Sequence, residues 1–435
     1  MRCLFQSVQR LSNSLPNDMN LLIVSQYFWP ESFIINDLAR VLRDVGHSVV
    51  IATGKPNYPE GIIYDGYSVA GVQKEIFEGN IEVVRVPLRP RGSGKAIDLF
   101  LNYLSFVWSG LIWFPRLLRG RRFDAILVFA GSPNVALPAI PLKWTHRAHL
   151  VLWIQDLWPE SLSATGFIRS PAILKLVELV VRGTYLAADT LLVQSRAFMA
   201  PVSRLANTEK VHYYPNSLDA SPSEVAGNVT LPPELIEMLK ERFCVVFAGN
   251  IGTAQAVGTL VDAAKRLKDL PQVRIVLVGG GSMLEWVRQK KEELELGNLV
   301  LAGRYPMSAM AGIYRHASCL VATLKDEEIF SLTIPSKIQA YLAAGRPIIA
   351  SINGEGARVV MEAGAGLACA AEDSLGLANC IRTLHAMPES DRHNMGCAGR
   401  RYFLENFEMR SQAVRLIEIL QRRIAETSTA KTHSR

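Results

Sequence analysis

The sequence predicts an α/β protein with two doubly wound, parallel-sheet domains. Three observations lead to this prediction. Residues 21–25 and 48–53 are apolar runs typical of buried parallel strands, and a helical segment at 33–45 separates them. The same alternation of apolar strands and helices returns after residue 244. Residues 220–232, between the two halves, are small and polar and include prolines, as expected of a linker.

Composition places the chain among globular proteins. It has 435 residues, enough for a core in each of two domains, and 20% of them are charged. The six cysteines lack the CxxC spacing of a zinc site and give no disulfide framework, which suits a reduced, cytoplasmic compartment. The net charge of +7 allows an anionic partner, whether nucleic acid, phospholipid or a diphosphate ligand.

The domain limits follow from these patterns. We expect a disordered extension at 1–18, with Met19 as an alternative start immediately before the first strand. We then expect an N-terminal domain at 19–218, a linker at 219–232 and a C-terminal domain at 233–408. A last helix at 409–424 should return to the first domain, and a disordered tail should follow at 425–435.

The first strand ends in a loop that carries Glu31 and Ser32. Doubly wound sheets bind ligands at the carboxyl ends of their strands, so Glu31 is a candidate ligand-binding carboxylate. A carboxylate just before a helix is equally consistent with a helix cap. The sequence leaves both interpretations open.

A basic and aromatic segment follows the strand expected at 81–86. Aromatic residues crowd the apolar stretch at 99–115, and eight cations stand against one acid across residues 85–122. We interpret 99–122 as an amphipathic helix or helix pair in a membrane interface, with arginines on anionic lipid. The alternative is a core helix with a solvated basic end.

Another group of polar side chains follows the strand expected at 150–154. Asp156 and Glu160 come directly after it, and Trp158 lies between them. Carboxylates at the carboxyl end of a strand, beside tryptophan, indicate an enclosed site. Surface charge is the alternative. A helix at 172–187 and strands at 190–194 and 211–214 complete this half.

In the second half, glycine loops follow two strands. Gly249, Asn250 and Gly252 follow the strand at 244–248, and residues 279–281 are three glycines. Leu284 stands at the third glycine position of GxGxxG, so a dinucleotide cofactor is not supported. Arg304 follows a third strand, at 299–302.

A helix opening at Pro335 and ending before Gly345 precedes a buried strand at 347–351. Its start offers free N–H groups, and the polar residues around it are Ser331, Thr333, Ser336 and Lys337. On spacing alone this is an ordinary loop-helix-strand unit. Because the two glycine loops should meet at the same sheet edge, the segment becomes a candidate diphosphate site.

Four motifs give the chain a family resemblance: Tyr-Pro-Asn-Ser-Leu-Asp at 214–219, Phe-Ala-Gly-Asn-Ile-Gly at 247–252, Val-Leu-Val-Gly-Gly-Gly at 276–281, and the segment from Pro335 to Pro347. Together they resemble GT-B glycosyltransferases, with two Rossmann-like domains facing across a cleft, of the retaining family 4 type. Motifs at 25–31, 155–161 and 329–337 resemble those of bacterial N-acetylfucosamine transferases and colanic acid transferases.

The resemblance implies a nucleotide-sugar donor, UDP-linked and N-acetylfucosamine-like, in the C-terminal domain. Its contacts would be Gly249, Asn250, Gly252, Arg304, Ser331, Thr333, Pro335, Ser336, Lys337 and Glu355. It also implies a polyprenyl-diphosphate-linked sugar acceptor in the N-terminal domain, bound by Glu31, Ser32, Trp158 and Glu160. The catalytic candidates are Asp156, Lys337 and Glu31.

The expected reaction is sugar transfer with retention, in O-antigen, capsule or exopolysaccharide synthesis. The chain contains no D-x-D triplet, so we expect no metal, and we expect neither a cofactor nor a nucleic-acid partner. The protein would be peripheral, at the inner face of the bacterial cytoplasmic membrane.

The chain departs from the family pattern at one place. Many members carry two glutamates where this chain has Leu332 and Ala340, and the second glutamate usually contacts the ribose of the nucleotide. The departure keeps two alternatives open. One is a sugar-nucleotide epimerase of the same fold, and the other is a non-catalytic partner subunit.

Overall fold

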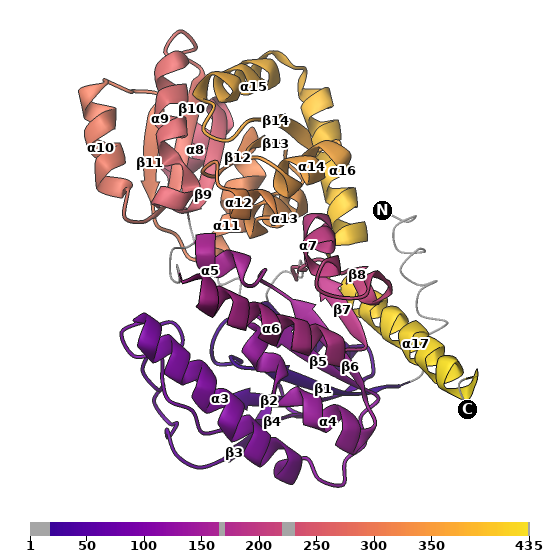
Figure 1. Ribbon diagram of the computed structural model, residues 1–435. Helices are drawn as coiled ribbons and strands as arrows, with labels where there is room; N and C mark the ends of the chain where they lie inside the picture. Colours follow the sequence, from indigo (N-terminus) through magenta and orange to yellow (C-terminus); the bar gives the residue numbers. More distant parts are fainter. Residues whose placement is uncertain (1–17, 165–169, 220–230, 434–435) are drawn as a thin grey trace. The chain divides into compact units, whose positions relative to one another are not determined.

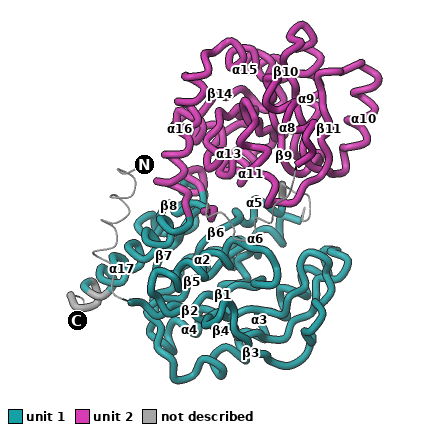
Figure 2. Tube along the Cα trace, turned by 180° about the vertical axis from the view of Figure 1, so that it is seen from behind, with its two compact units in different colours: residues 1–194, 199–216, 409–435 teal, residues 195–198, 217–408 magenta. Residues whose placement is uncertain are grey.

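The computed structural model describes residues 18–164, 170–219 and 231–433, which form two compact units (Figure 2). Unit 1 comprises residues 1–194, 199–216 and 409–435, and unit 2 comprises residues 195–198 and 217–408. Except for Asp18, the predicted extension at 1–18 lies outside the described residues, and so do residues 220–230 of the predicted linker.

An eight-stranded sheet forms the centre of unit 1, in the order β3-β4-β2-β1-β5-β6-β7-β8 (Figure 1). All neighbouring strands are parallel except β3 and β4. The central strands read as continuous apolar runs because helices cover both faces. The strands are β1 (Asn20–Ser25), β2 (Ser48–Gly54), β3 (Gln73–Phe77), β4 (Ile81–Val86), β5 (Ala125–Ala130), β6 (His149–Ile154), β7 (Thr190–Val193) and β8 (Val211–Tyr213).

Helices α2 (Ile34–Asp44) and α17 (Met409–His433) pack side by side on one face of this sheet (Figure 2). Their apolar side chains, such as Leu38 and Leu416, share a core with Ile23 and Ile51 of the strands. The other face carries α3 (Ala96–Leu117), α4 (Ala139–His146) and α6 (Pro171–Ala187). Shorter helical segments are η2 (Pro133–Ala136), α5 (Glu160–Ala164), α7 (Met199–Ser203) and η4 (Thr208–Lys210).

The C-terminal helix is longer than the sequence suggested. α17 runs from Met409 to His433, so the prediction of a disordered tail from residue 425 is wrong as far as residue 433. No glycine or proline follows Ala425, so nothing in the backbone chemistry stops the helix. Hydroxyl contacts continue along it, with Thr427 Oγ1 donating to the carbonyl of Arg423 at 2.7 Å.

The apolar and aromatic segment forms one helix, α3, and not a pair. Its buried side includes Phe106 and Phe114, and Gly110 allows close approach, since a β-carbon there would lie 2.7 Å from Pro138 Cβ. The opposite side is exposed and apolar, at Ile97, Phe100, Leu104, Trp108 and Leu111. Helix α3 is long and apolar enough to cross a membrane, and its buried side packs on the rest of unit 1.

Unit 2 is built on a six-stranded sheet in the order β11-β10-β9-β12-β13-β14, with every neighbouring pair parallel. The strands are β9 (Phe243–Asn250), β10 (Val273–Gly280), β11 (Leu299–Gly303), β12 (Cys319–Thr323), β13 (Ile348–Ser351) and β14 (Gly366–Cys369). Alternate residues of β9 face different cores, Val246 on one side and Phe247 on the other. This burial on both sides explains the apolar runs.

One core of unit 2 contains side chains from α8 (Pro233–Glu241), α11 (Met307–His316), α13 (Ser336–Ala344), α14 (Glu355–Glu362) and α16 (Glu389–Asn406). The other contains side chains from α9 (Val257–Arg266), α10 (Leu284–Glu293) and α15 (Ser374–Ala386). The short segments η3 (Arg196–Phe198), η5 (Thr253–Gln255) and α12 (Glu328–Ser331) complete the unit. The predicted doubly wound α/β class is confirmed in both units.

Candidate active site

Lys337 lies across the carboxyl end of β9, at the sheet edge where the sequence predicted that the glycine loops and this helix start would meet. It stands in the first turn of α13, its Nζ is 3.7 Å from the centroid of the Phe247 ring, and it donates to Gln255 Oε1. A β-carbon on Gly249, whose φ is +134°, would lie 2.7 Å from Lys337 Cε. Only a glycine therefore leaves room for the lysine at this point.

The charge of Lys337 has no acidic partner among the residues that the structure describes. Burial lowers its pKa from 10.5 to about 7. An anion bound beside the amine would supply the missing partner and favour the ammonium form. The surroundings of Lys337 are therefore suited to binding an anion.

A second cation reaches the same strand ends. Arg304 follows β11 and passes over Gly280, where a β-carbon would lie 2.0 Å from Arg304 Nε. Gly280 pairs in register with Asn250 of β9, and a β-carbon on Gly281 would lie 2.5 Å from Asn250 Oδ1. Asn250 Nδ2 would lie 2.7 Å from a β-carbon on Gly252. Asn250 and Arg304 are thus packed against the glycine loops that the sequence predicted to converge.

The hydroxyl groups before α13 are less available than expected. Ser331 Oγ donates to the Glu328 carbonyl at 2.7 Å, and Thr333 Oγ1 donates to the Phe330 carbonyl at 3.5 Å. Ser336 is exposed, and no side chain caps the helix, whose N-cap residue is Pro335. The helix start therefore keeps free backbone donors. Gly345 ends the helix with φ +67°, as predicted.

Glu355 is held within unit 2. It lies buried in the first turn of α14, where Arg358 bridges both carboxylate oxygens at 2.9 and 3.0 Å. The backbone N–H of Arg196 donates to the same carboxylate at 3.1 Å. The Glu355 carboxylate, which we expected to contact the nucleotide, therefore already has three donors within unit 2. Its contact with the nucleotide stays a prediction. At Leu332, where many family members have a glutamate, the backbone carbonyl accepts a hydrogen bond from Ser195 Oγ at 2.5 Å.

In unit 1, Glu31 joins two loops. Its Oε1 accepts the N–H groups of Asn57 and Tyr58, both at 2.7 Å, and its Oε2 accepts that of Phe28 at 3.0 Å. The N-cap of α2 is Phe33, without a side-chain bond, so the helix-cap interpretation of Glu31 is wrong. Burial raises the pKa of Glu31 to about 7, against the opposing effect of the three N–H groups. The carboxylate positions loops and is not open to a ligand.

The two loops that Glu31 joins carry an aromatic cluster of Tyr27, Phe33 and Tyr58. Their ring centroids lie 5.2 to 5.7 Å apart, and the Arg91 guanidinium stands 4.9 Å above Tyr58 and 5.8 Å above Tyr27. Sequence reasoning missed this cluster. The available signal was that aromatic residues stand in the loops after both β1 and β2.

Asp156 follows β6 and lines a narrow, mostly apolar crevice with Trp158. Although the side chain reaches solvent, loss of hydration raises its pKa. Trp158 Nε1 donates to the Gly131 carbonyl at 3.2 Å, which fixes the loop. Glu160 is exposed, 4.0 Å from an amino group of Arg204, and Ser32 is exposed on the loop after β1.

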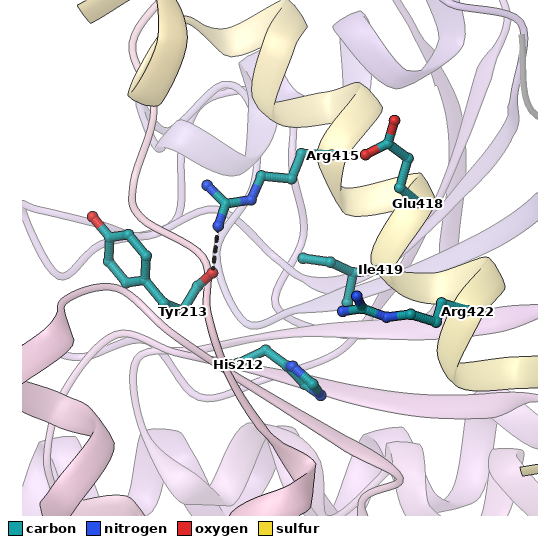
Figure 3. A pocket seen from close by; sticks show the side chains of 6 residues that line it. All are labelled: His212, Tyr213, Arg415, Glu418, Ile419 and Arg422. Atoms are coloured by element: carbon teal, nitrogen blue, oxygen red, sulfur yellow. Dashed lines mark hydrogen bonds between the residues drawn. The ribbon is translucent and has the colours of Figure 1, made fainter. Parts of the chain in front are cut away.

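A roomier cavity, of about 400 Å³, lies elsewhere in unit 1, between β8 and α17 (Figure 3). Arg415 bonds the Tyr213 carbonyl at 3.4 Å, and Arg422 extends toward His212. None of the predicted site residues lines it. We therefore place the candidate chemistry at the strand ends and not in this cavity.

Two family models match the chain. Residues 33–217 match a glycosyl transferase 4-like domain, and residues 242–387 match glycosyl transferases group 1. Together they cover most of the chain and every strand of both sheets except β1. The chain belongs to the GT-B glycosyltransferases of the family 4 type.

Two curated proteins are similar to this glycosyltransferase. WbjE of Pseudomonas aeruginosa, named as a probable glycosyltransferase, is 26% identical over 300 residues, covering 66% of this chain and 72% of WbjE. The Escherichia coli (strain K12) protein WcaI, named for colanic acid biosynthesis, is 24% identical over 339 residues, covering 75% of this chain and 82% of WcaI.

Solved structures share the fold of this glycosyltransferase. Sucrose-phosphate synthase from Thermosynechococcus elongatus superposes with a TM-score of 0.68 at 17% identity, covering 94% of this chain and 100% of that one. The Anabaena protein Alr3699/HepE in complex with UDP superposes with a TM-score of 0.61 at 16% identity, covering 95% of this chain and 100% of that one. These likenesses confirm the GT-B fold predicted from the sequence.

Proposed function

We propose that this glycosyltransferase moves a sugar from a nucleotide-diphosphate sugar, UDP-linked, to a lipid-linked sugar acceptor during cell-surface polysaccharide synthesis. The observation that carries the proposal is Lys337, which lies half-buried over Gly249 and has no acidic partner among the described residues. The uncapped start of α13 adds backbone donors, and Arg304 adds a second cation at the neighbouring strand end. Such a set stabilises the charge that develops on a departing nucleoside diphosphate.

The relatives support the nature of the substrates. WcaI is named for colanic acid biosynthesis, and Alr3699/HepE shares the fold and was solved with UDP. Asp156, with its raised pKa beside the apolar crevice, would act as a polar or general-base contact to the acceptor hydroxyl. We propose retention of configuration and a metal-independent reaction, in which cations of the chain take the place of a metal.

We further propose that the protein is peripheral, on the cytoplasmic face of the membrane. The exposed residues of α3 recur at helical spacing, and α6, on the same face of the sheet, exposes four more apolar side chains, at Ile173, Leu176, Leu179 and Leu186. Arg116, Arg119 and Arg122 are exposed near the end of α3, whereas Arg121 is paired with Glu82 at 2.8 Å. Exposed arginines beside an apolar surface favour an anionic membrane.

One assay tests the proposal and its rivals. A panel of UDP- and GDP-sugars is offered with a polyprenyl-diphosphate sugar acceptor, and the products are weighed by mass spectrometry. An elongated lipid is the expected product. An epimerised nucleotide sugar would support the epimerase, and no product from any donor would support a non-catalytic subunit.

Two variants link that assay to the site. Lys337→Ala should lower turnover by about a hundredfold or more, because removing one preorganised donor from a charge-stabilising site costs about 3 kcal/mol. Lys265→Ala removes an exposed lysine from α9 of the same unit and should leave turnover unchanged. Equal turnover in both variants would remove Lys337 from the reaction.

A further inference from the structure

We infer that Arg91, displayed on the aromatic cluster of unit 1, binds the diphosphate of the lipid-linked acceptor. The inference rests on the proposed function and adds a subsite to it. Neither the family models nor the named relatives assign a role to this side chain. The ligand class is a prenyl diphosphate that carries a sugar.

Arg91 differs from the two arginines nearest to it, Arg85 and Arg89, in lacking an acidic partner among the described residues. Arg85 is buried against Glu75 at 2.5 Å, and Arg89 pairs with Asp98 at 3.3 Å. Within the described residues, the Arg91 side chain makes neither an ion pair nor a hydrogen bond, and it contacts only ring faces. Stacking uses the flat side of a guanidinium and leaves its N–H edge open, so Arg91 can still bind a phosphate through two bonds.

The buried Glu31 explains how this arginine is held. Glu31 fixes the backbone of Asn57 and Tyr58, and Asn57 Oδ1 accepts the backbone N–H of Arg91 at 3.0 Å. The same loop presents the Tyr58 ring on which the guanidinium rests. One inaccessible carboxylate thus sets both the backbone and the ring platform of Arg91, and this makes Glu31 a positioning residue.

The place of Arg91 suits a diphosphate better than it suits other anions. Besides burial, which raises the pKa of Tyr103 in α3, the charge of Arg91 lowers this pKa and the charge of Asp156 raises it, so both Arg91 and the proposed base lie near one aromatic side chain. Arg91 also lies five residues before α3, whose exposed apolar surface we assign to the membrane. In a prenyl diphosphate sugar, the diphosphate joins the lipid to the sugar. It would therefore lie between a membrane helix and the base, where Arg91 stands.

The test compares two soluble acceptors in the absence of vesicles. One is the acceptor sugar on a short-chain prenyl diphosphate, and the other is the same sugar on a neutral alkyl chain. Arg91→Gln should raise the KM for the diphosphate acceptor by about ten- to hundredfold, the loss typical of a charge-assisted contact. The KM values for the neutral acceptor and for the nucleotide sugar should not change, and Arg91→Lys should recover part of the loss.

The matched control is Arg89→Gln, two residues away, whose charge is already paired with Asp98. It should change neither KM. An equal loss on both acceptors would make Arg91 structural, and a higher KM for the nucleotide sugar would assign it to the donor. Either result, or no change, overturns the inference.

A binding measurement keeps the inference testable if no transfer is found. Calorimetry would follow a short-chain prenyl diphosphate binding to the Lys337→Ala protein, in which the other anion site is weakened. Adding Arg91→Gln should reduce affinity by about tenfold or more. Unchanged affinity overturns the Arg91 subsite, whereas missing turnover with intact binding overturns only the proposed reaction.

Discussion

The lowered pKa of Lys337 makes UDP binding depend on pH. With a pKa of about 7, about half of the lysines carry a proton at pH 7, and about one in a hundred does at pH 9. UDP should bind the ammonium form, so binding above pH 7 must include proton uptake. The apparent Kd should then rise about tenfold per pH unit, or about 2.7 kcal/mol between pH 7.5 and 9.5. A terminal phosphate, with its second pKa near 6, is fully ionised throughout this range.

Calorimetry in two buffers of different ionisation enthalpy measures the proton uptake directly. Lys337→Met keeps the length of the side chain without its charge, and it should bind UDP weakly with no pH dependence. Lys265→Met, on the exposed surface of α9, should behave like the original protein. A Kd that is flat with pH, or one that rises equally in Lys337→Met, would refute the reasoning.

The lowered pKa of Lys337 also makes the free energy of unfolding depend on pH in the absence of UDP. The folded-state pKa lies below the unfolded value of 10.5, so the unfolded chain holds the proton more tightly between pH 7 and 10.5. The Lys337 contribution to stability is therefore full above pH 10.5 and is lost as the pH falls through about 7.

Three further predictions concern neighbouring features. Gly249→Ala adds a methyl group 2.7 Å from Lys337 Cε and should weaken UDP binding about tenfold in a titration. The control Gly297→Ala, in open space, should not weaken UDP binding, and equal effects of the two substitutions would contradict the packing argument. Glu31→Gln should lower the free energy of unfolding, measured by urea denaturation, by about 2 kcal/mol, because the buried N–H of Phe28 loses its acceptor. A change as small as that caused by Glu60→Gln, at an exposed position, would contradict this prediction. Trp108→Glu should release the protein from anionic vesicles in a sedimentation assay, whereas Met307→Glu, at a residue 85% exposed on unit 2, should not. If both variants stay bound to the vesicles, the assignment of α3 to the membrane is wrong.

Sequence reasoning succeeded where local pattern and sheet topology agree. Continuous apolar runs identify parallel strands, and the carboxyl ends of such strands meet at one edge. The convergence of Lys337, Gly249 and Arg304 could therefore be predicted from the sequence. β3 was missed because its polar residues alternate in exposure, as on an edge strand, and give no apolar run.

The rest depended on tertiary contacts that leave no local trace. Nothing near Glu31 in the sequence indicates that its partners are the N–H groups of Asn57 and Tyr58. The charge count across residues 85–122 treated every arginine alike, but Arg85 is buried and paired whereas Arg91 is not. The expected nucleotide role of Glu355 likewise overlooked Arg358, three residues along a helix that we had not predicted.

The packing of α17 has a consequence for the order of synthesis. Residues 409–420 of this helix complete the core against β1 and α2, and Leu416, Ile417 and Leu420 are fully buried there. A ribosome makes this helix after both sheets, so the face that α2 covers only in part stays incompletely covered until α17 has emerged. Unit 2 can finish folding first. Removing the last 30 residues should therefore leave the first domain aggregation-prone, even though every one of its strands remains.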